Sequence, residues 1–316
     1  MSPWAAGLCG ILVSFTGSLA ANVCHAQDLA PRAYVIAPIH SNAITLTYSF
    51  FDGGPLFDGT VPITGATAKV NVTIFNYAHS LRLFGRTANF TGSLPYGVGN
   101  LRGTVVGAEA FAYRSGFLPA TLRFSVNLLG GPAMNVAEFM KWRQKTIVGI
   151  SFRLVPKTGQ YDPTKLINFG ANRWAFKPEV GFSHRRGHWI VDAYGGAWLY
   201  TTNPEFFSHN QFSPGTNTQA QSPIGSFEGH LSYDFRPRFW ISLDGNYWFG
   251  GTTSLNGVEN PTTLQKNSRV GGTASIPLSR HQSIKLSYSN GAYIRYGGNF
   301  QNVSVAWQYS WLGRPN

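Results

Sequence analysis

The residues most suggestive of acyl-transfer chemistry are His230 and Ser232, which stand two positions apart. On a strand they would share a face, with backbones about 7 Å apart, which is compatible with a base and a nucleophile. A second fragment, Ser289-Asn290-Gly291, is not preceded by a histidine at the spacing that such a site needs. We therefore expect no enzyme, and we interpret His230 as a polar residue on an inward face.

Metal and nucleotide chemistry find no support in the residue pattern. The eight histidines are scattered, and Cys9 and Cys24, the two cysteines, both lie in the first 26 residues. Gly97-Val98-Gly99 and Gly103 lack the spacing and the following helix of a dinucleotide-binding loop. We interpret these glycines as part of a flexible external loop, and we expect neither a metal nor a cofactor.

The N-terminus has the pattern of an export signal. An apolar stretch covers residues 8–21, and the small residues Cys24 and Ala26 fit the −3 and −1 positions of a signal-peptidase site. We predict a signal peptide at 1–26, cut after Ala26. This segment contains no Asp, Glu, Lys or Arg, so the formal net charge of +12 belongs to the remainder of the chain.

The composition excludes two large classes of protein. Only 12% of the 316 residues are charged, whereas about 25% is usual in soluble domains, which argues against a typical cytosolic enzyme. Beyond the N-terminus no run of 18 or more apolar residues could form a spanning helix. Hydrophobicity that is dispersed in this way is typical of strands in lipid.

The elements that must position any site alternate with a period of two residues, as strands do. In the first, Ile44, Leu46 and Tyr48 share one face, and threonine and serine share the other. Twelve such segments are recognisable: 43–50, 66–80, 87–97, 122–128, 144–156, 173–184, 188–200, 223–235, 239–247, 268–279, 284–289 and 303–311. They predict an all-β fold, a transmembrane up-and-down antiparallel β-barrel of about twelve strands over 43–311.

The connections give the strands a direction. Residues 235–238 form a tight turn, whereas 201–222 and 251–267 are long and rich in Asn, Thr, Gly and Pro. Outer-membrane barrels place short turns on the periplasmic side and long loops outside. With the N-terminus on the periplasmic side, this alternation requires an even number of strands. This requires 98–116 to be an external loop; if 103–113 extends strands instead, fourteen strands become an alternative.

The flanks of the barrel carry weaker signals. We predict a periplasmic segment at 27–42 and a tail at 312–316. Asn135 and Glu138 form a capping box, which predicts a short amphipathic helix over 135–144 at the inner rim. Pro178 cannot donate to a closed sheet, so we expect a bulge there.

The distribution of charge supports the barrel. The predicted outward faces contain no Lys or Arg, each of which would cost about 2–4 kcal/mol at the bilayer midplane. Opposite charges in the lumen tend to pair, so we expect them to cross-link the wall or to line a narrow hydrated path. The predicted inward charges are Lys69, Arg123, Arg153, Lys177, Arg269, Lys285, Glu179, Asp192, Glu228, Asp234 and Asp244.

The remaining positive charge gathers at the predicted inner turns and their flanks, including Arg185, Arg186, Arg236 and Arg238. A solvated rim near anionic lipid head groups explains it. Nucleic-acid binding would need a continuous basic surface interleaved with stacking aromatics, so we expect no nucleic-acid partner.

Three blocks carry a resemblance to a known family: residues 43–53 (AITLTYSFFDG), 125–130 (SVNLLG) and above all 159–179 (GQYDPTKLINFGANRWAFKPE). Over nearly the whole mature chain the sequence resembles Gram-negative outer-membrane transporters of the meta-pathway of phenol degradation. The resemblance implies passive diffusion of hydrophobic or aromatic compounds across the outer membrane. It also implies contacts with lipid and lipopolysaccharide, and recognition of the C-terminal strand by the barrel assembly machinery.

The better-known fatty-acid and toluene channels carry an N-terminal plug. Only residues 27–42 precede the first predicted strand here, which argues against a plug. Our candidate residues for a solute path lie on the predicted inner faces: Arg153, Lys177, Glu179, Asp192, Tyr194, Trp198, Glu228, His230, Trp240, Asp244 and Trp248. These side chains would equally well simply fill a closed barrel.

Three other functions remain as alternatives. One is a general or ion-conducting porin, and another is a structural or adhesion barrel that transports nothing. The third is an outer-membrane lipase, whose His-x-Ser-Asn-Gly motif is incomplete at both places where the chain offers a fragment of it.

Overall fold

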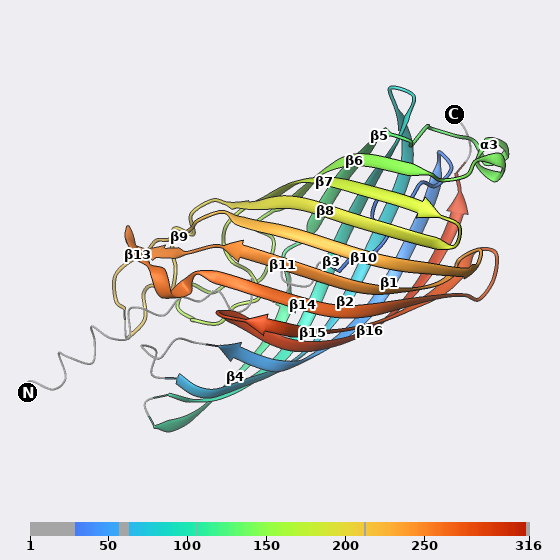
Figure 1. Ribbon diagram of the computed structural model, residues 1–316. Helices are drawn as coiled ribbons and strands as arrows, with labels where there is room; N and C mark the ends of the chain where they lie inside the picture. Colours follow the sequence, from blue (N-terminus) through green and yellow to red (C-terminus); the bar gives the residue numbers. More distant parts are fainter. Residues whose placement is uncertain (1–28, 57–62, 106, 212, 314–316) are drawn as a thin grey trace, which may run out of the picture.

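The computed structural model describes residues 29–56, 63–105, 107–211 and 213–313. They form a closed antiparallel barrel of tilted strands (Figure 1), in which each wall strand pairs with its neighbour in sequence and β1 pairs with β16. The wall strands are β1 (Ser41–Leu56), β2 (Ile63–Leu83), β3 (Arg86–Val105), β5 (Thr121–Leu129), β6 (Thr146–Val155), β7 (Ala175–Arg186), β8 (Trp189–Tyr200), β10 (Ile224–Arg236), β11 (Phe239–Gly250), β14 (Gln265–Pro277), β15 (Gln282–Ile294) and β16 (Gly297–Leu312).

The predicted fold class is therefore confirmed, with twelve strands in the wall. The predicted signal peptide lies outside the described residues. We call the end at which β1 begins and β16 ends the inner end, because it carries the short turns that face the periplasm in such barrels. The opposite end is the outer end.

The predicted external loop at 98–116 is wrong. Residues up to Val105 continue β3, and β4 (Ala108–Phe117) returns beside them. Phe117 of β4 lies opposite Tyr96 of β3, and Thr121 of β5 lies opposite Ser93. β4 and β5 thus pair with successive parts of β3 as two halves of one strand, and the wall keeps an even number of strands.

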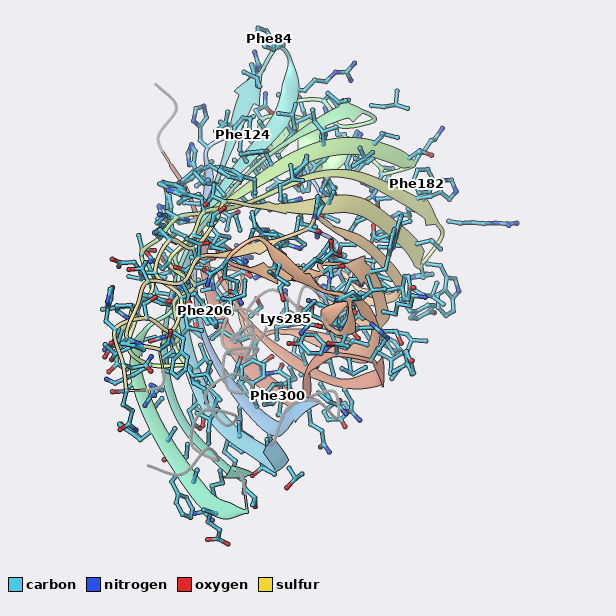
Figure 2. The ribbon with its side chains drawn as sticks, turned by 90° about the vertical axis from the view of Figure 1, so that its left-hand side faces the viewer. Phe84, Phe124, Phe182, Phe206, Lys285 and Phe300 are labelled. Atoms are coloured by element: carbon cyan, nitrogen blue, oxygen red, sulfur yellow. The ribbon has the colours of Figure 1, made fainter. Side chains whose placement is uncertain are left out.

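The outward faces form an apolar surface. Leu46, Val180 and Leu243 are each at least half exposed, as expected for side chains that meet hydrocarbon. Figure 2 shows Phe182 on the outside of the wall and Lys285 within its outline. The alternation that predicts the strands therefore places these apolar residues correctly.

Lys69 is an exception, and its predicted inward position is wrong. Its side chain points outward, is 67% exposed and lies 4.0 Å from the Asp52 carboxylate. β2 is 21 residues long, whereas about 9–11 residues suffice to cross a bilayer. Lys69 lies in the outer part of this strand, where an outward charge costs little.

The inner end bears the expected helix, α3 (Val136–Lys141). The Asn135 side chain accepts from the Glu138 amide, and the Glu138 carboxylate accepts from the Asn135 amide. The predicted capping box is therefore confirmed. None of the described helices is both long and apolar enough to cross a membrane.

The bulge predicted at Pro178 is wrong. The ladder between β7 and β8 skips Lys177 and Pro178 but resumes in the same register, and the ladder between β6 and β7 continues through Pro178. The sheet thus accommodates the missing donor by losing two pairings on one side.

The outer connections pack against one another. β9 (Gln219–Gln221), β12 (Thr253–Leu255) and β13 (Val258–Asn260) form a small sheet, followed by the 3-10 helix η2 (Pro261–Thr263). The Tyr161 hydroxyl donates to the Glu205 carbonyl at 2.8 Å and accepts from the Asn203 amide. These contacts join the connection 156–174 to the connection 201–223, and we call the assembly the outer cap.

Candidate functional site

The segment that precedes β1 folds into the barrel from its inner end. Tyr34 is only 1% exposed. Its hydroxyl lies 2.9 Å from Glu179 Oε1, to which it donates, and 3.1 Å from Ser151 Oγ. Both partners belong to inward faces of the wall. Residues 29–40 therefore occupy part of the lumen, and the expectation that this short segment forms no plug is wrong.

Two glycines make room for the Tyr34 ring. A Cβ on Gly181 would lie 2.0 Å from Tyr34 Cε2, and one on Gly149 would lie 2.5 Å from Tyr34 Cδ1. Asn127 donates its side-chain amide to the Tyr34 carbonyl at 3.2 Å. Burial and the neighbouring Glu179 carboxylate raise the pKa of Tyr34 to about 12, so the hydroxyl stays protonated and remains a donor.

A second anchor of the segment is Arg32. Its guanidinium lies 2.6 Å from Asp234 Oδ1 and 4.3 Å from the centre of the Trp240 ring. The amide of Ala33 donates to the Tyr194 hydroxyl at 3.0 Å. The segment is therefore held by an ion pair, a cation–π contact and hydrogen bonds that reach β5, β6, β7 and β8.

Paired charges line the middle of the lumen on the same side. Lys177 Nζ lies 2.8 Å from Glu179 and 2.9 Å from Glu228. His230 Nδ1 lies 2.8 Å from Asp244 Oδ1. These contacts join β7, β10 and β11 across their inward faces. Because each charge has a partner, the network cross-links the wall, as the sequence predicts.

His230 and Ser232 do not form a catalytic pair. The Nδ1 atom of His230 faces Asp244, and its Nε2 atom faces Glu228 at 3.8 Å. Among the described residues, the buried Ser232 hydroxyl has no hydrogen-bond partner. The arrangement therefore lacks the nucleophile–base contact of an acyl-transfer site.

Two apolar clusters fill much of the outer half of the lumen. One contains Trp198 and Trp248 with Ile224 and Ile294. The other is built from residues of β1, β2, the β4–β5 connection, the outer cap and β16: Phe51, Ala68, Val70, Val72, Leu118, Phe169 and Phe300. A solute that enters from outside therefore meets aromatic and aliphatic side chains first. It then meets the paired side chains of Lys177, Glu179, Glu228, His230 and Asp244, which we call the charged belt.

The glycines predicted to lie in a flexible loop belong to β3, so that prediction is wrong. A Cβ on Gly97 would lie 2.7 Å from Leu118 Cδ1 and 3.2 Å from the Phe169 ring. The absence of a side chain at Gly97 thus leaves space for Phe169 in the lumen.

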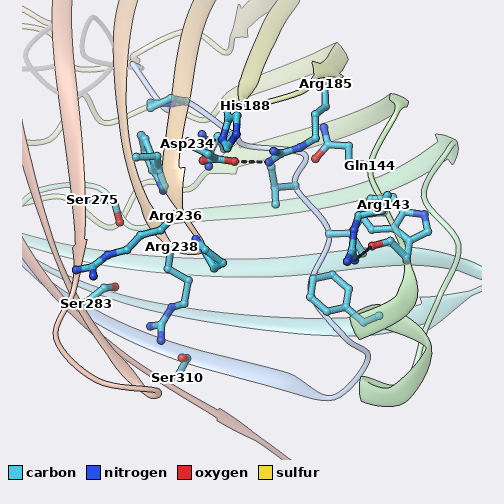
Figure 3. A pocket seen from close by; sticks show the side chains of 18 of the residues that line it. Arg143, Gln144, Arg185, His188, Asp234, Arg236, Arg238, Ser275, Ser283 and Ser310 are labelled. Atoms are coloured by element: carbon cyan, nitrogen blue, oxygen red, sulfur yellow. Dashed lines mark hydrogen bonds and ion pairs between the residues drawn. The ribbon is translucent and has the colours of Figure 1, made fainter.

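Two cavities lie along the described part of the lumen. The larger, about 990 Å³, opens at the inner end and is lined by the N-terminal segment, α3 and several wall strands (Figure 3). The smaller, about 210 Å³, lies deeper, between Leu29 and the strands β1, β2 and β14–β16. We call the larger one the mouth cavity and the smaller, deeper one the inner cavity.

All eleven candidate path residues lie on inward faces, and all but the partly buried Arg153 are buried. Of these two cavities, Trp240 lines the mouth cavity and Asp244 the inner cavity, and the other nine candidates line neither. The other nine lie in the charged belt, in the apolar clusters or against the N-terminal segment. Most of the predicted set therefore packs the lumen.

Sequence reasoning missed a set of small polar residues that border the two cavities. They lie on inward positions of β14, β15 and β16: Thr273, Ser275, Ser283, Ser287, Ser289, Asn302, Ser304 and Ser310. Their signal was present in the alternation, because a run of serines opposite large apolar residues leaves the inward side short of volume.

The 159–179 block forms part of the outer cap. The Asn168 side chain donates to the carbonyls of Asp162 and Lys165, and it accepts from the Asp162 amide. Hydrogen bonds from Lys165 and Thr164 lower the pKa of Asp162 to about 2. This compact turn precedes Phe169, which inserts into the apolar cluster.

A family model described as "Putative MetA-pathway of phenol degradation" matches residues 54–309. No curated protein matches the chain. Among solved structures, the COG4313 outer membrane channel from Pseudomonas putida F1 is similar with a TM-score of 0.72 and 16% identity, covering 90% of this chain and 100% of that chain.

Two other structures are more distant. The β domain of the Bordetella autotransporter BrkA has a TM-score of 0.50 and 12% identity, covering 86% of this chain and 100% of that chain. The TodX deltaS2S3 mutant monoaromatic hydrocarbon channel has a TM-score of 0.46 and 11% identity, with coverage of 88% and 91%.

Proposed function

The chain belongs to the phenol-degradation MetA-pathway family, and from this membership and the geometry of the lumen we propose that it is an outer-membrane channel for small hydrophobic or aromatic compounds. Transport is by passive diffusion. The channel performs no catalysis and needs no cofactor.

The observation that carries the proposal is the sequence of environments along the lumen. Apolar clusters that contain Trp198 and Phe169 lie at the outer end, and the two cavities follow along the wall formed by β14–β16. Aromatic side chains followed by small polar ones suit a solute such as a phenol, which has an apolar ring and a hydroxyl.

An ion-conducting general porin is disfavoured by the same features. Such a porin needs a wide aqueous lumen, whereas here the N-terminal segment, the paired charges and the apolar clusters occupy much of the interior. The lipase alternative is disfavoured by the arrangement at His230.

The partners follow from the location in the outer membrane. The apolar outer face contacts lipid. In the same proposal, lipopolysaccharide surrounds the outer end of the wall, and the barrel assembly machinery recognises the C-terminal strand β16 during insertion. Small hydrophobic solutes are the cargo.

Uptake in cells with and without the protein tests the function. Initial rates are measured for dilute radiolabelled phenol and toluene, with a sugar of similar size as the hydrophilic control. We expect the protein to raise uptake of the aromatic compounds several-fold and to leave sugar uptake nearly unchanged. Equal rates in both strains for every hydrophobic solute tried would overturn the proposal.

A further inference from the structure

The mouth cavity is strongly basic. Six cationic side chains and one carboxylate, that of Asp234, border it: Arg32, Arg143, Arg185, Arg236, Arg238 and Lys285. A concave site with one sign of charge and low-dielectric walls concentrates counter-ions. The charge therefore favours anions at this end of the lumen.

Most of these cations are already engaged. Arg32 and Arg185 both pair with Asp234, and Figure 3 shows the contact between Arg185 and Asp234. Arg238 donates to three backbone carbonyls of the turn between β14 and β15. Arg143 donates to the carbonyls of Met140 and Trp142. These four hold the mouth together and contribute to the field.

Lys285 and Arg236 differ from the other four. Within the described part of the chain, neither makes an ion pair or a side-chain hydrogen bond, whereas Arg143 and Arg238 donate to backbone carbonyls. Arg236 lies 5.6 Å from the centre of the Phe239 ring. Lys285 Nζ lies 5.9 Å from the centre of the Trp240 ring, and Figure 3 shows Arg236 reaching toward the wall that carries Ser275 and Ser283. The Lys285 ammonium faces the lumen without a counter-charge, which is costly unless a ligand or solvent supplies one, whereas the Arg236 side chain is exposed at the inner end.

The position of Lys285 connects the two cavities. On β15 the successive inward residues are Ser283, Lys285 and Ser287. Ser283 and Lys285 line the mouth cavity, whereas Ser287 lines the inner cavity. Any solute that passes between the cavities along this wall therefore passes the ammonium group of Lys285.

Another part of the lining of the mouth cavity is apolar. Val35, Ile36, Phe139 and Trp142 border it from the N-terminal segment and α3, and Trp240 borders it from the wall. A ligand that suits both parts has an aromatic ring and an anionic group, with small polar partners available from the serines of β14–β16.

We propose that the mouth cavity binds small aromatic carboxylates, with Lys285 and Arg236 receiving the carboxylate and the ring lying against Trp240. The inference rests on the proposed function and narrows its substrate class. It assigns to the inner end of the lumen a preference for the anionic form of an aromatic compound.

Calorimetric titration of the purified, detergent-solubilised full chain with benzoate tests the site, with benzyl alcohol as the neutral counterpart. We expect benzoate to bind and benzyl alcohol to bind at least ten-fold more weakly. Lys285→Gln should weaken benzoate binding about ten-fold, and Lys285→Arg should retain most of it. Lys266→Gln, on an exposed outer-end residue of β14, is the matched control and should bind like the unaltered protein.

The outcomes separate this inference from the proposed function. Absence of benzoate binding, or equal binding by the Lys285→Gln variant, overturns the basic site, even where cells still take up phenol and toluene. Benzoate binding that depends on Lys285 supports the site, even where the uptake experiment defeats transport of neutral aromatics.

Discussion

At the scale of single residues, glycines decide what the lumen can hold. The ring of Tyr34 occupies space left by Gly149 and Gly181, and Phe169 occupies space beside Gly97. In both places a large side chain from outside the wall enters the barrel where the wall has no side chain of its own. The alternation of side chains along a strand predicts which face is inward. It does not predict which distant side chain packs into the space beside an inward glycine.

Gly181→Val should displace the N-terminal segment. Its Cβ would meet the Tyr34 ring at 2.0 Å, which leaves no rotamer adjustment that retains both groups. We expect residues 29–40 to become accessible to protease added from the inner side. Tyr34→Ala in the same chain should relieve the clash with the valine. Gly229→Val, at a position where a Cβ meets open space, should leave the segment protected from protease. A protected segment in the Gly181→Val variant would contradict the packing described for Tyr34.

Gly97→Ala should loosen the outer cap. The added methyl group would crowd Leu118 and Phe169, and overpacking of this kind costs about 1–3 kcal/mol. Denaturant unfolding from lipid vesicles measures the change in free energy. Gly245→Ala, whose nearest neighbour would be at 3.9 Å, serves as the control. Equal stability of the two variants would contradict the tight packing of Phe169 against Gly97.

At the scale of elements, the alternation of side chains predicts the twelve wall strands and most of their faces, with β2 at Lys69 as the exception, and the connections predict the direction of each strand. It fails where a strand leaves the membrane. The long hairpin of β3 with β4 and β5 alternates like the rest of the wall, but its glycines and Pro119 are typical of a loop. The pairing of β4 with β3, from Val105 opposite Ala108 to Tyr96 opposite Phe117, is what establishes that 98–116 is a strand hairpin.

The lipid-facing surface gives a prediction for β11. Leu243 is 68% exposed near the middle of this strand, so Leu243→Arg places a charge in hydrocarbon. We expect a loss of about 2–4 kcal/mol in the free energy of unfolding from vesicles. Val258→Arg is the control, because Val258 is equally exposed but belongs to β13 in the outer cap. A neutral effect at Leu243 would place that face outside the bilayer.

At the scale of the whole molecule, the lumen has two unlike sides. The strands β5–β11 carry the charged belt and hold the N-terminal segment, whereas β14–β16 border the cavities with serines. The sequence predicts that inward charges pair, since both signs are nearly balanced. It does not predict that residues 29–40 fold back into the barrel, because the contacts of Tyr34 with Ser151 and Glu179 join positions more than 100 residues apart.

Deletion of residues 29–38 should enlarge the path. The deletion removes Tyr34 and Arg32, which occupy the side of the lumen opposite the serines. We expect single-channel conductance in planar bilayers to rise several-fold, with Tyr34→Phe remaining close to the unaltered protein because it retains the ring. Unchanged conductance after the deletion would mean that the outer cap, and not the segment, limits the path.

The docking of Tyr34 also constrains how the barrel can form. The segment runs directly into β1, and β1 closes the ring by pairing with β16, the last strand to be synthesised. Tyr34 contacts β5, β6 and β7 from within the barrel. The segment 29–40 must therefore either enter a closed ring through its inner opening or be enclosed when β1 pairs with β16. Docking of the segment and closure of the ring are therefore linked steps in the assembly of this barrel.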